Sequence, residues 1–186
     1  MIPFTPLVMG LVFSTMPFLS APVPHPVTLT EWQVEMGDRI VVDTKENEGY
    51  LIHTDGRFTA FPVATGQRRI VCYIGRCYNG ATPERHWQIA SKDIKGDRLT
   101  FGPSGRFLRL YRGSEETAYG FHEYGHEDRM FDDQPRFKSM GCIIVKKAVM
   151  DILDQTFSMN EGTIDVITRF GVEEPVTLAF APVETR

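Results

Sequence analysis

The sequence predicts a mostly β fold, a β-sandwich or mixed sheets, with one or two helices. Short apolar and β-branched runs are separated by turns about every ten residues between residues 39 and 66, a spacing typical of sandwiches and barrels. Residues 146–157 carry apolar side chains at helical spacing and predict one helix. The 186 residues suffice for one domain of about 150 residues and a tail.

A β-meander is expected first, because an Asp-Gly turn at Asp55-Gly56 separates two of three successive apolar runs. The predicted strands are residues 39–43, 49–53, 58–64, 69–72, 86–89, 99–101, 107–111, 119–122, 143–145 and 162–168. A further edge strand is expected at residues 176–180. Loops are expected at residues 92–97 and 123–138, the latter as a flexible lid. Arg106, Arg109 and Arg112 recur every third residue, so we expect a solvated surface, with one guanidinium available for a substrate carboxylate.

Composition excludes several classes of protein. Hydrophobic residues make up 42% of the chain and charged residues 24%, as in ordinary globular domains. The net charge is −4 and there is no basic run, so nucleic-acid binding is not expected. We expect a monomer without cofactor or metal.

The N-terminal segment predicts export. Residues 1–24 contain no charged side chain, and the apolar stretch 7–19 has the length of a signal-peptide core but is short for a membrane span. We therefore expect residues 1–21 to be a signal peptide or an apolar arm, followed by a Pro-rich linker at residues 22–38. The first basic residue is Arg39, so an arm packed on the domain or a misassigned start remains an alternative.

Three cysteines fit an oxidising compartment. Cys72 and Cys77 are separated by four residues around Gly75 and could close a small disulfide, although two unpaired thiols are also possible. Their spacing does not fit a zinc site, and a second cysteine pair is missing. Cys142 would then be the odd, free thiol.

The strongest chemical signal lies between His122 and Cys142. A thiol acts as a nucleophile only as the thiolate, so it needs a base or a positive field, and His122 lies twenty residues upstream. Gly141 permits a sharp turn that presents backbone N–H groups to an oxyanion, and Ser139 offers an orienting hydroxyl. These residues predict a Cys/His acyl-transfer site; a small buried cysteine of the core is the alternative.

The spacing resembles a known signature. His122, sixteen intervening residues, then Ser139-x-Gly141-Cys142 and an apolar residue resemble the L,D-transpeptidase (YkuD-type) family, which cross-links peptidoglycan through a catalytic cysteine. Other family-like pieces follow in the same order: residues 61–66 (FPVATG), Thr82-Pro83 with Trp87, and Gly162-Thr163 with Val166. The resemblance covers residues 39–167 and implies a catalytic domain at residues 39–170, with a C-terminal tail at 171–186.

The resemblance implies a reaction and a place for it. Cys142 would attack the carbonyl joining residues three and four of a peptidoglycan stem peptide, with His122 as base and the Gly141 and Cys142 N–H groups as oxyanion donors. The terminal D-amino acid would leave, and an acceptor amine would resolve the thioester. The protein would act on the cell-wall side of the membrane, in cell-wall biogenesis and cell shape.

Departures from the family pattern leave alternatives open. Met140 stands where the family usually has His, Ile144 where it has Arg, and Arg85 and Glu123 where Gly is common. An L,D-carboxypeptidase using water, or a non-catalytic wall-binding relative, is therefore weighed beside the transpeptidase. Residues 122–126 also read His-Glu-Tyr-Gly-His, so a zinc metallopeptidase using His122 and His126 is a third alternative, opposed by the helix-breaking glycines.

Overall fold

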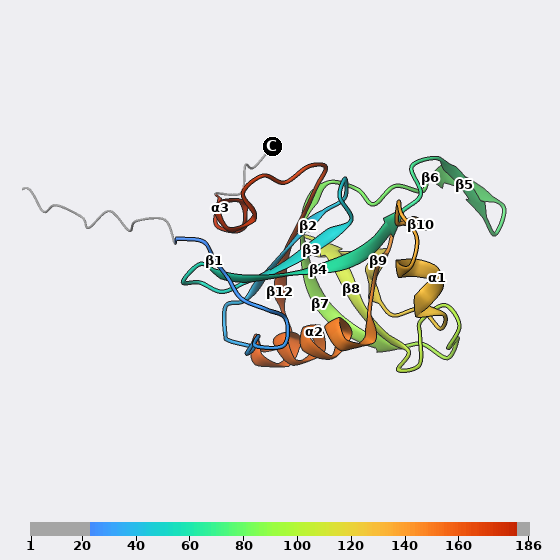
Figure 1. Ribbon diagram of the computed structural model, residues 1–186. Helices are drawn as coiled ribbons and strands as arrows, with labels where there is room; N and C mark the ends of the chain where they lie inside the picture. Colours follow the sequence, from blue (N-terminus) through green and yellow to red (C-terminus); the bar gives the residue numbers. More distant parts are fainter. Residues whose placement is uncertain (1–22, 182–186) are drawn as a thin grey trace, which may run out of the picture.

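The computed structural model describes residues 23–181 and consists mainly of strands with three short helices (Figure 1). The prediction of a mostly β fold is confirmed, with three helices where one or two were expected. The predicted signal peptide lies outside the described residues. Within residues 23–181, no helix combines the length and apolar character needed to span a bilayer.

Twelve strands and three helices make up the described chain. The strands are β1 (His25–Pro26), β2 (Arg39–Asp43), β3 (Glu48–Ile52), β4 (Arg57–Gly66), β5 (Ile70–Tyr73), β6 (Arg76–Asn79), β7 (Arg85–Ile94), β8 (Arg106–Arg112), β9 (Glu115–His122), β10 (Phe137–Ser139), β11 (Ile143–Val145) and β12 (Ile164–Arg169). The helices are α1 (Glu127–Phe131), α2 (Lys147–Met159) and α3 (Pro175–Ala179).

Ten strands form one sheet that closes on itself. The strand order is β1-β4-β11-β9-β8-β7-β12-β2-β3; the tenth strand, β10, pairs with β4, and β3 also pairs with β4. The long strand β4 makes this closure possible, because residues 58–62 pair with β3 and residues 63–64 pair with β11. A strand that is shared between neighbours in this way forms a corner of the sheet.

The core fills the inside of the closed sheet. Alternate residues of β2, Ile40 and Val42, face this core, as expected from the period-two alternation of side chains along a strand. The 13-residue helix α2 supplies Val149, Met150 and Leu153 to the same cluster, which matches the helical spacing read from the sequence. Figure 1 shows α2 directly after β11, along one end of the sheet.

A second, smaller cluster lies on the other face of β2. Val41 and Ile167 contact Val176 and Ala179 of α3, so the expected edge strand at residues 176–180 is wrong. Pro175 occupies the first turn of this helix, where proline is favoured because its missing N–H is not needed.

The loop before β8 also differs from expectation. Residues 99–101 form a turn rather than a strand, because the Asp97 side chain accepts hydrogen bonds from the N–H groups of Leu99 and Thr100. Such local side-chain bonds compete with strand pairing. Strand β7 extends to Ile94, so the loop expected to begin at residue 92 begins later.

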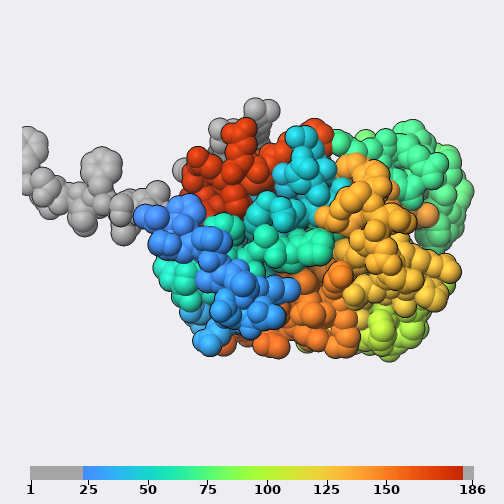
Figure 2. Space-filling model, viewed as in Figure 1, coloured from blue at the N-terminus to red at the C-terminus, as the bar shows by residue number. Residues whose placement is uncertain are grey.

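The segment at residues 23–38, expected as a linker, lies on the surface of the domain (blue in Figure 2). Strand β1 pairs in parallel with the start of β4. Trp32 is buried and stacks on the ring of His53, with centroids 3.8 Å apart. His53 is itself buried, and its Nδ1 lies 2.5 Å from Asp38. His53 is therefore a packed core histidine.

The separate two-stranded hairpin β5–β6 projects from the body of the domain in Figure 1. A disulfide joins Cys72 and Cys77, which face each other across the two strands. Among the described residues Cys142 is the free cysteine. The disulfide considered from the sequence, Cys72–Cys77, is therefore present in the structure.

Candidate active site

Cys142 closes a tight turn between β10 and β11. The Ser139 hydroxyl donates to the Cys142 carbonyl at 2.5 Å and accepts the Gly141 N–H at 3.1 Å. Gly141 has φ +119°, and a Cβ at this position would lie 2.5 Å from the Tyr119 ring. Glycine is thus required here both by its backbone conformation and by the aromatic ring beside it.

The outer pieces of the sequence signature meet behind this turn. The Thr82 hydroxyl donates to the Gly141 carbonyl at 3.0 Å and accepts the Gly66 N–H at 2.9 Å. A Cβ on Gly66 would lie 2.1 Å from a backbone oxygen, so only glycine allows this approach. Ser139 pairs with Gly66 in the β10–β4 register. Three segments far apart in sequence therefore hold the Cys142 turn in place.

Strand pairing brings the Cys142 turn beside the strand that carries His122. The parallel pairing of β11 with β9 sets Ile143 opposite Phe121 and Ile144 opposite His122. Cys142 immediately precedes β11, and its Sγ lies 3.7 Å from the carbonyl of Ala118 in β9. The thiol therefore lies against the strand that ends in His122.

His122 is buried at the end of β9. Its Nδ1 lies 2.6 Å from the Glu123 carbonyl, and its ring packs against those of Phe101 and Phe107. Burial lowers the pKa of His122, against the opposing effect of backbone hydrogen bonds to Glu123 and Thr100. The imidazole is therefore neutral at physiological pH, and a neutral imidazole carries a lone pair on one of its two ring nitrogens.

The Cys142 thiol lies in a partly desolvated environment. Burial raises the pKa of Cys142 to about 11, although the residue as a whole is partly exposed. A backbone hydrogen bond from Gly120 and the positive charge of Arg109 act in the opposite direction but are weaker. Sγ donates to the Ala118 carbonyl at 3.7 Å. At neutral pH the group is a thiol, so a nucleophilic role requires a base at the moment of attack.

No hydrogen bond joins His122 to Cys142 within residues 23–181; each has the backbone partners just described. Tyr119 is a further residue beside the Cys142 turn that the sequence analysis did not single out. Its ring borders Gly141, and burial, with a smaller effect of the Cys142 charge, raises the pKa of its phenol. Only its position three residues before His122 could have drawn attention to it.

The geometry excludes a zinc metallopeptidase site formed by His122 and His126. His122 ends a strand, whereas His126 is an exposed residue that precedes α1, so the two do not share a helix face. The Glu123 carboxylate, which would be the general base of such a site, is buried and bonded to Arg106. Within residues 23–181 no cluster of His, Cys, Asp and Glu side chains could hold a metal ion.

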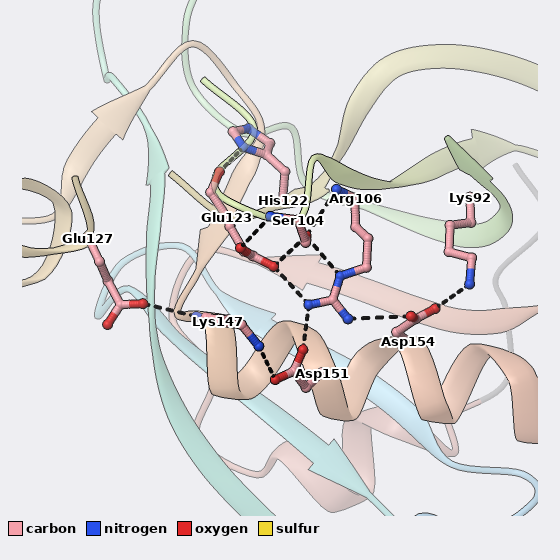
Figure 3. A network of polar contacts seen from close by, with 9 residues as sticks. All are labelled: Lys92, Ser104, Arg106, His122, Glu123, Glu127, Lys147, Asp151 and Asp154. Carbon is pink, nitrogen blue, oxygen red and sulfur yellow. Dashed lines mark hydrogen bonds and ion pairs between the residues drawn. The ribbon is translucent and has the colours of Figure 1, made fainter. Parts of the chain in front are cut away.

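A network of polar side chains surrounds Glu123 (Figure 3). Arg106 reaches from β8 to Glu123 at 2.8 Å, and to Asp151 and Asp154 of α2 at 2.5 and 3.3 Å. The predicted solvated surface is therefore wrong for two of the three arginines: the Arg106 and Arg109 side chains are only 13% and 15% exposed. Arg109 pairs with acidic side chains of β7 and β9.

The other positions that depart from the family pattern have no base function, and the histidine of β7 has partners of its own. His86 pairs opposite Ile167 in β12, and its ring contacts Arg169 at 3.2 Å. Met140 is exposed and Ile144 is buried in the sheet. The segment at residues 123–138, expected as a flexible lid, contains α1 and β10.

Comparison with known sequences identifies the family. The sequence profile of the L,D-transpeptidase catalytic domain, YkuD, matches residues 37–167. The chain belongs to the YkuD family. This span runs from just before β2 into β12 and includes the Cys142 turn and α2. A comparison with curated proteins gave no significant match.

Solved structures share the YkuD fold at low sequence identity. The L,D-transpeptidase of Xylanimonas cellulosilytica matches with TM-score 0.50 and 21% identity, over 74% of this chain and 63% of its own. The helical cell shape determining protein Pgp2 of Campylobacter jejuni matches with TM-score 0.51 and 14% identity, over 80% of this chain and 53% of its own. Bd1075 of Bdellovibrio bacteriovorus matches with TM-score 0.51 and 13% identity, over 77% of this chain and 51% of its own. This chain thus spans about half to three fifths of these relatives.

Proposed function

We propose that this protein is a peptidoglycan L,D-transpeptidase that acts by cysteine acyl transfer. The observation that carries the proposal is the position of Cys142: a free thiol on a glycine turn, beside the strand that ends in His122, held by the Ser139 and Thr82 bonds. Membership of the YkuD family supports peptidoglycan stem peptides as substrate. The Cys72–Cys77 disulfide supports an exported protein, because such bonds persist in oxidising compartments.

In the proposed first step, His122 takes the proton of Cys142 and Sγ bonds to the carbonyl carbon between residues three and four of the stem. The carbon–nitrogen bond then breaks, and the leaving amine of the terminal D-amino acid takes the proton from His122. An acceptor amine then bonds to the thioester carbon and the carbon–sulfur bond breaks. The proton lost by the amine passes through His122 to Sγ, which restores the thiol.

Two details of the site shape this mechanism. The Gly141 N–H is used by Ser139, so the oxyanion is assigned to the Cys142 N–H, and the Gly141 N–H would contribute only if the turn loosens. The missing His122–Cys142 hydrogen bond is compatible with general base catalysis, because such contacts often tighten only in the complex with substrate.

A wall-binding protein without turnover is the second candidate. It is favoured by the raised pKa of Cys142, about 11, and by the His122 ring bonding to backbone rather than to the thiol. An L,D-carboxypeptidase would use the same acyl-enzyme with water as acceptor.

Mass spectrometry of muropeptides separates these functions. The protein is incubated with tetrapeptide-stem muropeptides, with Cys142→Ala as the matched control. We expect cross-linked dimers and released D-amino acid only when Cys142 is present. Release without dimers would assign the carboxypeptidase, and binding without any product would refute catalysis in favour of the wall-binding protein.

A further inference from the structure

The Glu123 side chain is a buried carboxylate immediately after His122. It is 1% exposed and accepts hydrogen bonds from Arg106 Nη2 at 2.8 Å and from the Ser104 hydroxyl at 2.6 Å. A buried carboxylate is costly unless it is paired and hydrogen-bonded, so these contacts fix its position. The YkuD pattern commonly has Gly here, so this anchor distinguishes the present chain.

The anchor acts on His122 through the backbone of Glu123. The same residue whose side chain is fixed by Arg106 and Ser104 offers the main-chain carbonyl that lies 2.6 Å from His122 Nδ1. The loop before β8 packs tightly on it: a Cβ on Gly102 would lie 2.3 Å from the Glu123 Cβ. Glu123 is therefore held at its side chain and by its neighbours, and its carbonyl has little freedom to turn.

Arg106 extends the anchor to the thiol side of the site. Its guanidinium also binds Asp151 and Asp154 of α2, and α2 follows β11 and the Cys142 turn almost directly. In Figure 3 the arginine lies between the end of β9 and this helix. One side chain thus ties the strand that carries His122 to the helix that follows Cys142.

We propose that Glu123, anchored by Arg106 and Ser104, is a positioning residue for His122. Its carbonyl lies 2.6 Å from Nδ1, and the Thr100 backbone is the other hydrogen-bond partner of the ring. The side-chain anchor keeps that carbonyl, and with it the imidazole ring, in one orientation. The inference rests on the proposed role of His122 as the base, but the anchor can be tested separately from turnover.

The test measures the His122 imidazole directly. ¹⁵N–¹H correlation spectra of the full chain report the tautomer and the titration of His122, and muropeptide assays report turnover, for wild type, Glu123→Ala and Glu123→Gln. In Glu123→Ala we expect the Nδ1–H signature to weaken or disappear and kcat to fall about 10²-fold, the cost of a misplaced catalytic group. Glu123→Gln keeps an oxygen for Arg106 and Ser104, so we expect it to restore the wild-type signals.

Two further variants complete the design. Asp154→Asn removes one ion pair of Arg106 on the α2 side without touching Glu123, so it is the matched control and should leave the imidazole signals unchanged. Glu123→Ala leaves Arg106 without its buried partner and can fail to fold; Ser104→Ala then removes one bond to the carboxylate, with a smaller shift expected in the same direction.

The outcomes separate the two proposals. Wild-type imidazole signals in a folded Glu123→Ala variant, or in Ser104→Ala where the former does not fold, would overturn the positioning role. Wild-type protein without turnover would refute the proposed function, while the tautomer signals would still decide whether Glu123 orients His122.

Discussion

The rate of alkylation should show that the Cys142 thiol is an unusually weak acid. With a pKa of about 11, the thiolate fraction at pH 7 is about 10⁻⁴, roughly 100-fold below that of a thiol with the ordinary value of 9.0. A more basic thiolate is intrinsically the better nucleophile, and a Brønsted slope of about 0.4–0.5 recovers roughly tenfold. At pH 7 we therefore expect iodoacetamide to react about tenfold more slowly with folded than with unfolded protein.

The pH profile separates ionisation from accessibility. Mass spectrometry would follow the modification of Cys142 from pH 6 to 10.5, with the other two cysteines kept in their disulfide and with unfolded protein as the reference. Steric shielding lowers the rate equally at every pH, whereas a raised pKa gives a rise of about tenfold per pH unit up to at least pH 10. A modification rate that stops rising below pH 9 would show that Cys142 is already ionised there in the free protein. This result would refute the argument that desolvation raises its pKa.

Three further changes test other parts of the structure. Gly141→Ala should lower stability by more than the roughly 1–2 kcal/mol of left-handed strain, because its Cβ would meet the Tyr119 ring; urea unfolding would measure this. Gly75→Ala, with φ +71° and open space, is the control for strain alone, and an equal loss would contradict the steric argument. His122 has a lowered pKa, so the unfolded chain binds its proton more readily, and stability should fall as pH drops below about 6.5, by at most about 1.4 kcal/mol per pH unit; an unchanged pH dependence in His122→Gln would contradict this. Trp32→Ala should lower the free energy of unfolding by about 3 kcal/mol if residues 23–38 belong to the folded domain. An unchanged midpoint of urea unfolding would show that this segment is a dispensable linker.

Local patterns predicted most of the strands but not how they close. The alternation along β2 and the Asp55-Gly56 turn were readable because each depends on neighbours in sequence. The closure through β4 depends on pairings between distant segments, which a single sequence does not display. The apolar run at residues 176–180 was misassigned because short apolar runs fit either a strand or a helix, and here Pro175 at the first helical turn decided for the helix.

The candidate site was predicted in part for a similar reason. The spacing from His122 to Cys142 pointed to both residues, and the pairing of β11 with β9 brings the Cys142 turn beside the strand that ends in His122. The role of Ser139 as a brace of the turn, and the use of the Gly141 N–H by that brace, follow from distances that spacing does not encode. The burial of Arg106 and Glu123 was missed because charged residues in a loop or strand are ordinarily solvated.

Intact-protein mass spectrometry tests the role of Cys142 most directly. The protein is mixed with a tetrapeptide-stem muropeptide, quenched in acid after short times, and digested to locate any adduct. We expect a thioester adduct equal to the stem without its terminal D-amino acid, located on Cys142, absent from Cys142→Ala and slow to form in His122→Gln. An adduct on another residue, or products formed without any adduct in the Cys142→Ala variant, would contradict cysteine acyl transfer at this site.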